Sequence, residues 1–175
     1  LKVGAFDDSG NDFGPVITPQ HRDKVVGFID SAERQGAKIV VDGRQPQVAG
    51  HAHGFYVGGT LIDGVTAAMD SYRNEIFGPV LQVMRVRTMQ EAMDLIFAFD
   101  DAAATGIYTR DGEAARYFSD HIKVGMVGIN VPLPVPVAYH SFGGWKRSLF
   151  GDLSAYGPDG VRFYTRRKTI TQIGR

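Results

Sequence analysis

The chain has 175 residues, of which 43% are hydrophobic and 22% are charged. These proportions are typical of one globular domain that is long enough to bury a core. The 19 Lys and Arg residues balance 19 Asp and Glu residues, which argues against nucleic acid or an acidic membrane surface as a partner. The absence of cysteine excludes disulfides and thiolate metal sites.

No segment predicts a signal peptide or a membrane span. Residues 1–14 carry Asp7, Asp8 and Asp12 where a signal peptide has an apolar core. The longest largely apolar run, residues 124–139, is shorter than a span and contains three prolines. We therefore expect a cytoplasmic protein, or one of the mitochondrial matrix if its source is eukaryotic.

The first half of the chain predicts one helix and three strands. Thr18 and Pro19 are typical of a helix N-cap and first helical position, and Gly36 is typical of a helix end. The predicted strands cover residues 38–41, 55–62 and 80–86.

The second half predicts helices and strands in alternation. A capping box of Thr88 and Glu91 predicts a helix that runs to about residue 99, with Ala92, Met93, Leu95 and Ile96 buried. A strand over residues 105–108, a helix over residues 112–121 and a strand over residues 126–129 follow. This alternation predicts an α/β fold with a mainly parallel sheet and flanking helices.

Residues 131–160 are rich in proline, glycine and aromatic side chains. A loop of this length is usually functional, and its aromatic residues argue against disorder, so we expect an ordered loop packed over the end of the sheet. A short helix near residues 161–164 and a β-prone tail over residues 168–172 are predicted after it.

Two weaker patterns concern metal and dinucleotide binding. His51 and His53 have the alternate spacing of some metal ligands, but no third ligand lies near them and the glycines on either side suggest a turn. We therefore expect no metal site. No Gly-x-Gly-x-x-Gly sequence follows a predicted strand, so the dinucleotide-phosphate fingerprint is absent.

Four segments resemble the aldehyde dehydrogenase superfamily, in the same order and at fitting separations. They are Phe-Gly-Pro-Val-Ile at 13–17, Gly-Phe-Tyr-Val-Gly-Gly-Thr-Leu at 54–61, Glu-Ile-Phe-Gly-Pro-Val at 75–80 and Ser-Phe-Gly-Gly-Trp-Lys at 141–146. Within the superfamily, the prolines and the Trp-Lys-Arg-Ser-Leu-Phe run of residues 124–152 resemble methylmalonate-semialdehyde dehydrogenases.

The resemblance implies an NAD-dependent enzyme that oxidises malonate or methylmalonate semialdehyde. In that family a cysteine adds to the aldehyde, coenzyme A rather than water takes the acyl group, and decarboxylation yields acetyl-CoA or propionyl-CoA. Because the chain has no cysteine and begins with Leu1, we expect a C-terminal fragment whose nucleophile lies upstream of Leu1 and which is inactive alone.

The resemblance also implies roles for five residues. Glu75 would accept hydrogen bonds from the nicotinamide-ribose hydroxyls, and Phe77 would pack against the nicotinamide side of the site. Phe142, Pro136 and His140 would line the aldehyde pocket. For His140 the residues alone leave two interpretations open, a base and a packed loop histidine.

By the same resemblance, residues 1–160 are the catalytic-domain portion, and residues 161–175 are a helix end and an oligomerisation tail that builds dimers or tetramers. The chain departs from the family at Ala102, Ala103 and Ala104, where the family usually has a Gly-Asn-Gly stretch beside the cofactor. Alanine restricts positive backbone angles, so this departure bears on cofactor affinity.

Two alternatives stay open from the sequence. The first is a hydrolytic NAD(P)-dependent aldehyde dehydrogenase that makes a free acid, and the second is a catalytically inactive assembly module. The choice between malonate and methylmalonate semialdehyde also stays open.

Overall fold

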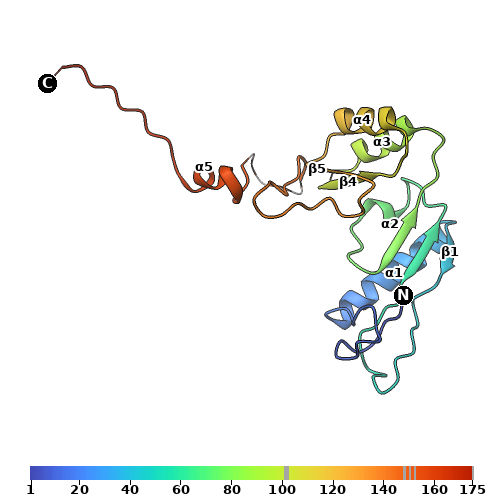
Figure 1. The fold of residues 1–175 in the computed structure, drawn as a ribbon. Helices are drawn as coiled ribbons and strands as arrows, with labels where there is room; N and C mark the ends of the chain where they lie inside the picture. The colour runs from blue at the N-terminus through green and yellow to red at the C-terminus, as the bar shows by residue number, and fades with distance from the viewer. Residues whose placement is uncertain (101–102, 148, 150, 152, 175) are drawn as a thin grey trace. The chain divides into compact units, whose positions relative to one another are not determined.

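The computed structural model describes residues 1–100, 103–147, 149, 151 and 153–174. The chain folds as two compact units, Leu1–Thr88 and Met89–Arg175. The first unit contains α1 (Pro19–Arg34), β1 (Lys38–Val41), β2 (Thr60–Asp63), α2 (Asp70–Arg73) and β3 (Val80–Val83). The second contains α3 (Met89–Ala98), β4 (Ala104–Ile107), α4 (Gly112–His121), β5 (Met126–Ile129), the short 3-10 helix η1 (Gly157–Asp159) and α5 (Gly160–Tyr164) (Figure 1).

The helix α1 begins and ends at the residues that the sequence predicts. The Thr18 hydroxyl accepts the backbone N–H of His21 at 3.1 Å, so it satisfies one of the free amides of the first turn. Pro19 occupies the first helical position, where its missing N–H costs nothing. Gly36 follows the helix with a φ of +99°, an angle that glycine adopts without a steric penalty.

The first sheet has the order β1-β2-β3, with β1 antiparallel to β2 and β2 parallel to β3. One apolar face of α1 packs against it, and Figure 1 shows the helix alongside the strands. The core formed there consists of Val25, Ile29, Ala32, Ala37, Val57, Ile62, Val65, Met69 and Ile76.

Two strands of the first unit are shorter than predicted. The strand expected over residues 55–62 is confined to Thr60–Asp63, because the residues before it form backbone hydrogen bonds with segments outside the sheet. Val16 donates its N–H to the Phe55 carbonyl at 3.0 Å, and Gly58 donates its N–H to the Gly43 carbonyl at 2.7 Å. The strand expected over residues 80–86 ends at Val83, where its register with β2 ends.

In the second unit, β4 and β5 pair in parallel, and α3 and α4 pack with them around a core of Met93, Phe118, Ile122 and Val124. The predicted helix over residues 112–121 and strand over residues 126–129 are confirmed. The helix α3 buries Met93 fully, whereas Ala92, Leu95 and Ile96 are only half-buried. The α/β class is confirmed, with two of the three strand pairings parallel and with two small sheets rather than one among the described residues.

Beyond β5 the described residues form only η1 and α5, and α5 matches the predicted short helix. The predicted β-prone tail forms no strand, and residues 165–174 are exposed. No helix in the described part of the chain is long and apolar enough to cross a membrane.

Candidate cofactor and substrate sites

The turn Glu75-Ile76-Phe77 is built around a buried isoleucine. Ile76 is buried in the core of the first unit, so the side chains on either side of it, Glu75 and Phe77, are exposed. Gly78 then packs against α1, where a Cβ would lie 2.7 Å from a methyl carbon of Val25. Only glycine therefore fits at this position without displacing the helix.

Phe77 adopts an uncommon backbone conformation that displays its ring. Its φ is +56°, a region that bulky residues avoid because it costs of order 1–3 kcal/mol. Its side chain is nevertheless 71% exposed, so burial of the phenyl ring does not offset that cost. Strain of this kind clusters at functional sites, which supports a binding role for the ring.

Two side chains of α1 hold this turn in place. The Nε2 atom of His21 donates a hydrogen bond to the Phe77 carbonyl at 2.7 Å, because a carbonyl oxygen can only accept. The Nζ atom of Lys24 donates to the Glu75 carbonyl at 3.2 Å. The helix therefore binds the backbone on both sides of Ile76.

The sequence prediction missed His21 and Lys24. Their three-residue spacing places them on the same face of α1, and this is the signal that the sequence contains. Their acceptors lie more than fifty residues further along the chain, so only the folded structure identifies them.

The Glu75 carboxylate is suited to a ligand with two hydroxyl groups. It is exposed, and in the part of the chain that the structure describes it takes part in no hydrogen bond or ion pair. A carboxylate has two acceptor oxygens and no donor, so it complements a pair of neighbouring hydroxyls, such as those of a ribose. The residues present therefore fit the predicted cofactor contact.

Asn130 directs the chain from β5 into the predicted substrate loop. Its φ is +57°, and its side-chain amide pairs reciprocally with the backbone of Thr109. The Thr109 N–H donates to Oδ1 at 2.9 Å, and Nδ2 donates to the Thr109 carbonyl at 3.0 Å. The side chain thus continues the pairing of β4 and β5 while the backbone turns away.

The predicted pocket residues lie in the loop that follows. The Phe142 side chain is 37% exposed, and its ring centroid lies 5.0 Å from that of Tyr156. Pro136 is half-buried and His140 is exposed. The His140 ring meets the Tyr139 ring edge to face at 5.2 Å. The His140 interpretation as a packed loop residue has this contact in its favour, and its role in an aldehyde pocket stays a prediction.

A hollow of about 510 Å³ lies beside the Ser-Phe-Gly-Gly-Trp-Lys motif of residues 141–146. It is lined by Gly125, Ser141, Gly143, Gly144, Trp145, Leu149 and Gly151. None of the three predicted pocket residues, Phe142, Pro136 and His140, lines that hollow. The two predicted cofactor residues belong to the first unit and the three predicted substrate residues to the second.

The alanine departure lies partly within the described residues. Ala102 lies outside them. The Ala103 carbonyl accepts the N–H of Met126 at 3.2 Å, and Ala104 opens β4 opposite the same residue. Among the described residues only Phe77 and Asn130 have a positive φ without being glycine, so Ala103 and Ala104 need no glycine-like angle.

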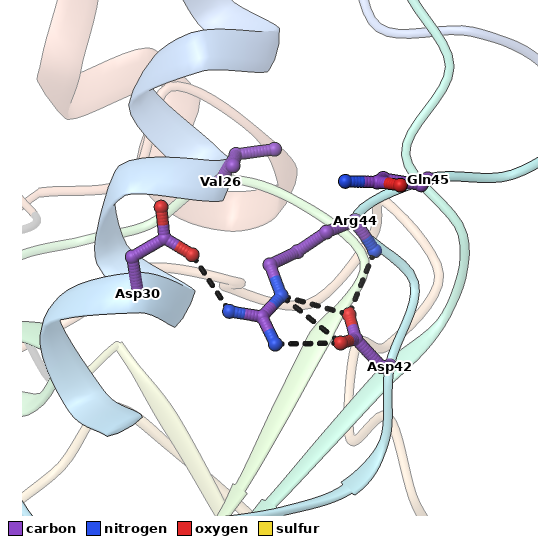
Figure 2. Close-up of a pocket in the computed structure, with 5 residues that line it drawn as sticks. All are labelled: Val26, Asp30, Asp42, Arg44 and Gln45. Carbon is purple, nitrogen blue, oxygen red and sulfur yellow. Dashed lines mark hydrogen bonds and ion pairs between the residues drawn. The ribbon is translucent and has the colours of Figure 1, made fainter. Parts of the chain in front are cut away.

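A second polar cluster, in the first unit, has a structural role. The Arg44 guanidinium donates to Asp30 of α1 at 2.7 Å and to Asp42 just after β1 at 2.6 Å, as Figure 2 shows. It also donates to Glu33 of α1 at 2.7 Å. The guanidinium holds the pKa of the Asp42 carboxyl below its usual range, and the three carboxylates raise the pKa of Arg44. The charged groups satisfy one another, so the cluster ties α1 to the end of β1.

His51 and His53 are both exposed. Among the described residues no group of three His, Cys, Asp or Glu side chains is arranged to hold a metal ion.

The described residues form an α/β protein. One unit displays the Glu75 carboxylate and the Phe77 ring, and the other contains the aromatic, proline-rich loop that bears Phe142. The family model described as "Aldehyde dehydrogenase family" matches residues 1–170. The chain therefore belongs to the aldehyde dehydrogenase family.

Individual relatives show which members of the family this chain resembles. A malonate-semialdehyde dehydrogenase of Pseudomonas aeruginosa is 65% identical over 172 residues, which cover 98% of this chain and 35% of the relative. A malonate-semialdehyde dehydrogenase of Oceanobacillus iheyensis is 43% identical over 171 residues, with the same two coverages. The chain thus spans about a third of the length of the curated relatives that it matches.

Solved structures agree with these relatives. The crystal structure of a methylmalonate-semialdehyde dehydrogenase from Oceanimonas doudoroffii matches 100% of this chain and 36% of its own, with 74% identity and a TM-score of 0.94. A protein from Sinorhizobium meliloti, described as a methylmalonate-semialdehyde dehydrogenase complexed with NAD, matches 97% of this chain and 35% of its own, with 51% identity and a TM-score of 0.93. The resemblance to this branch is confirmed.

Proposed function

We propose that this chain is part of an NAD-dependent, CoA-acylating dehydrogenase that converts malonate or methylmalonate semialdehyde, with loss of CO2, to acetyl-CoA or propionyl-CoA. The names of the relatives and the NAD complex of one of them support the substrate class and the cofactor. The structural observation that carries the proposal is the turn at Phe77, where a strained backbone displays a ring beside the Glu75 carboxylate, which has no partner among the described residues.

In this proposal the first unit orients the cofactor. The Glu75 carboxylate accepts hydrogen bonds from the two hydroxyls of the nicotinamide ribose. The exposed Phe77 ring packs against the nicotinamide side of the site and limits how far that ring can swing. His21 and Lys24 hold both residues in place through their backbone carbonyls. When bound, NAD supplies the hydride acceptor.

The second unit contributes to the aldehyde pocket. Phe142 lines it with Pro136 and His140, and the contact of Phe142 with Tyr156 sets the direction of its ring. Because this chain has no cysteine, we assign the nucleophile to a part of the longer protein outside these residues. The 175 residues alone are therefore expected to show no dehydrogenase activity.

We also propose that the protein is a homo-oligomer and that the tail takes part in the contact. Ile170 and Ile173 are almost fully exposed in a tail that pairs with nothing in the described part of the chain. Apolar side chains on an unpaired extended segment favour association with another strand.

Since the relatives are bacterial, we propose the cytoplasm as the compartment of this protein.

An assay of the full-length protein tests the reaction. Each of the two semialdehydes is supplied with NAD, with and without coenzyme A, and both NADH and the acyl product are measured. We expect NADH formation that depends on coenzyme A, with an acyl-CoA product. NADH with a free acid and no need for coenzyme A would favour the hydrolytic alternative, and no NADH under any condition would favour the inactive assembly module.

A further inference from the structure

Lys146 is the last residue of the Ser-Phe-Gly-Gly-Trp-Lys motif, and its ammonium group binds the end of a helix. The Nζ atom donates to the carbonyl of Ile96 at 2.7 Å, to that of Phe97 at 3.0 Å, and to that of Phe99. Ile96 and Phe97 belong to the last turn of α3 (Met89–Ala98). Carbonyls at a helix C-terminus lack donor partners within the helix and carry partial negative charge.

An ammonium group matches this position in both charge and geometry. It has three donors and no acceptor, and three carbonyl oxygens converge on it here. The Lys146 side chain is half-buried, so water competes less for these bonds than at a fully exposed site. The contact therefore acts as a C-terminal cap of α3 supplied from a residue about fifty positions away.

The neighbouring backbone strengthens the same attachment. The N–H of Arg147 donates to the carbonyl of Asp100 at 3.1 Å, so two consecutive loop residues bind the segment just after α3. On the other side of Trp145, the backbone at Gly143 and Gly144 packs so closely on Gly125 that a Cβ at Gly125 would overlap the Gly143 carbonyl. The segment 143–147 is thus held at both ends.

Phe142 immediately precedes the segment that is held in this way. Its ring is partly exposed and contacts Tyr156. Its position relative to the rest of the second unit therefore depends on where residues 143–147 are attached. A group that fixes this attachment also fixes the wall that Phe142 contributes to the pocket.

We propose that Lys146 is a positioning residue for the aldehyde pocket, which acts by fastening the loop that bears Phe142 to the C-terminal carbonyls of α3. Its consequence for the substrate depends on the proposed function, whereas the attachment itself does not. Lys146 touches neither substrate nor cofactor in this proposal.

The first test measures hydrogen exchange in the full-length protein, wild type against Lys146→Met, which keeps most of the length of the side chain and removes its charge and donors. We expect faster exchange in peptides that cover residues 93–100 and 141–147, with no change in peptides from residues 19–34. Unchanged exchange over residues 141–147 would overturn the attachment. This readout needs no enzymatic activity, so it decides the attachment even if the proposed reaction is wrong.

The second test measures steady-state kinetics of the same variant. We expect the KM for the semialdehyde to rise about tenfold, because small misplacements of positioning groups have effects of this size or larger, while the KM for NAD stays within about twofold. Lys146→Arg, which keeps the charge and several donors, should recover part of the loss. Faster exchange with an unchanged KM for the semialdehyde would leave Lys146 as a helix cap and would overturn its positioning role.

Arg147→Met is the matched control, because its side chain is also cationic but lies 3.7 Å from an exposed Asp100 carboxylate and is itself largely exposed. It should change neither the hydrogen exchange nor the KM for the semialdehyde.

A double-mutant cycle with Phe142→Ala completes the test. If Lys146 acts through Phe142, the Lys146→Met substitution should cost much less in the Phe142→Ala background, and fully additive losses would contradict the proposal. If Lys146→Met does not fold, Lys146→Gln, which keeps an amide donor, replaces it in all three measurements.

Discussion

The Nε2 atom of His21 lies 2.7 Å from the carbonyl oxygen of Phe77, and this hydrogen bond joins the first turn of α1 to the strained turn that displays the Phe77 ring. The two rings also lie near each other, with centroids 6.2 Å apart. A single helix residue therefore supports both the backbone and the side chain of a predicted cofactor contact.

Replacing His21 should disturb cofactor binding more than folding. In His21→Leu the Phe77 carbonyl loses its donor, a change of about 1 kcal/mol, and the positive φ of Phe77 is less well supported. We expect roughly a fivefold rise in the KM for NAD, with His21→Gln recovering part of it because its amide can donate to the same carbonyl. The exposed His53 provides a control, since His53→Leu should change nothing. An NAD KM that stays at the wild-type value in His21→Leu would show that the hydrogen bond does not position the turn.

Replacing Glu75 should weaken productive NAD positioning while the fold stays intact. In Glu75→Gln one charged acceptor is lost, which is worth roughly 1.5–3 kcal/mol. The carboxylate is exposed and has no partner in the described part of the chain, so the melting temperature should not fall. Steady-state kinetics with NAD as the varied substrate checks this, and wild-type values there would rule out the ribose contact.

Replacing Phe142 should impair aldehyde use more than NAD binding. Its ring is only partly buried and rests on Tyr156, so Phe142→Ala removes a pocket wall rather than a core residue. We expect the kcat/KM for the semialdehyde to fall about tenfold or more. Tyr156→Phe keeps the ring contact and should behave as wild type. Equal losses for both substrates, together with a lower melting temperature, would mark Phe142 as a structural residue instead.

The Arg44 cluster predicts a pH-dependent contribution to stability. Arg44 lowers the pKa of Asp42 below its usual value of 3.8, so the interaction is fully present above that pH and is lost as the pH falls through the lowered pKa. Arg44→Met should destabilise the first unit by roughly 1 kcal/mol at neutral pH, a value kept small because the carboxylates are partly solvated.

Thermal unfolding at a series of pH values checks this contribution. The difference in melting temperature between wild type and Arg44→Met should be largest near neutral pH and should shrink below pH 3.8. Arg34→Met, which alters an exposed arginine at the end of α1, serves as the comparison. A difference that is independent of pH would show that Arg44 stabilises through its packing alone.

Deleting residues 166–175 should reduce self-association. The tail forms no strand in the described part of the chain, and its isoleucines are exposed, so it is available to pair with another copy. Sedimentation of the chain at tens of micromolar, with and without the tail, measures the effect. A monomer in both cases would be incompatible with the tail as the oligomer contact.

Much of the fold follows from local features of the sequence. The start of α1 at Thr18 and Pro19, its end before Gly36 and the bounds of α4 and β5 agree with the prediction. Caps, proline and glycine act on the backbone of their immediate neighbours, so their effect can be predicted without knowledge of distant contacts. The family motif at residues 75–80 likewise predicts Glu75 and Phe77 as site residues from the sequence alone, and this stays a prediction.

The tertiary structure decided what depends on distant partners. The strand predicted over residues 55–62 is shortened because Phe55 and Gly58 bond to Val16 and Gly43 rather than to a neighbouring strand. Donor side chains such as those of His21 and Lys146 can find carbonyls only where the folded chain brings them close. The sequence therefore determines which residues can begin a helix or display a carboxylate, whereas only folding determines which backbone groups each side chain holds, because a hydrogen bond acts over about 3 Å whatever the separation along the chain.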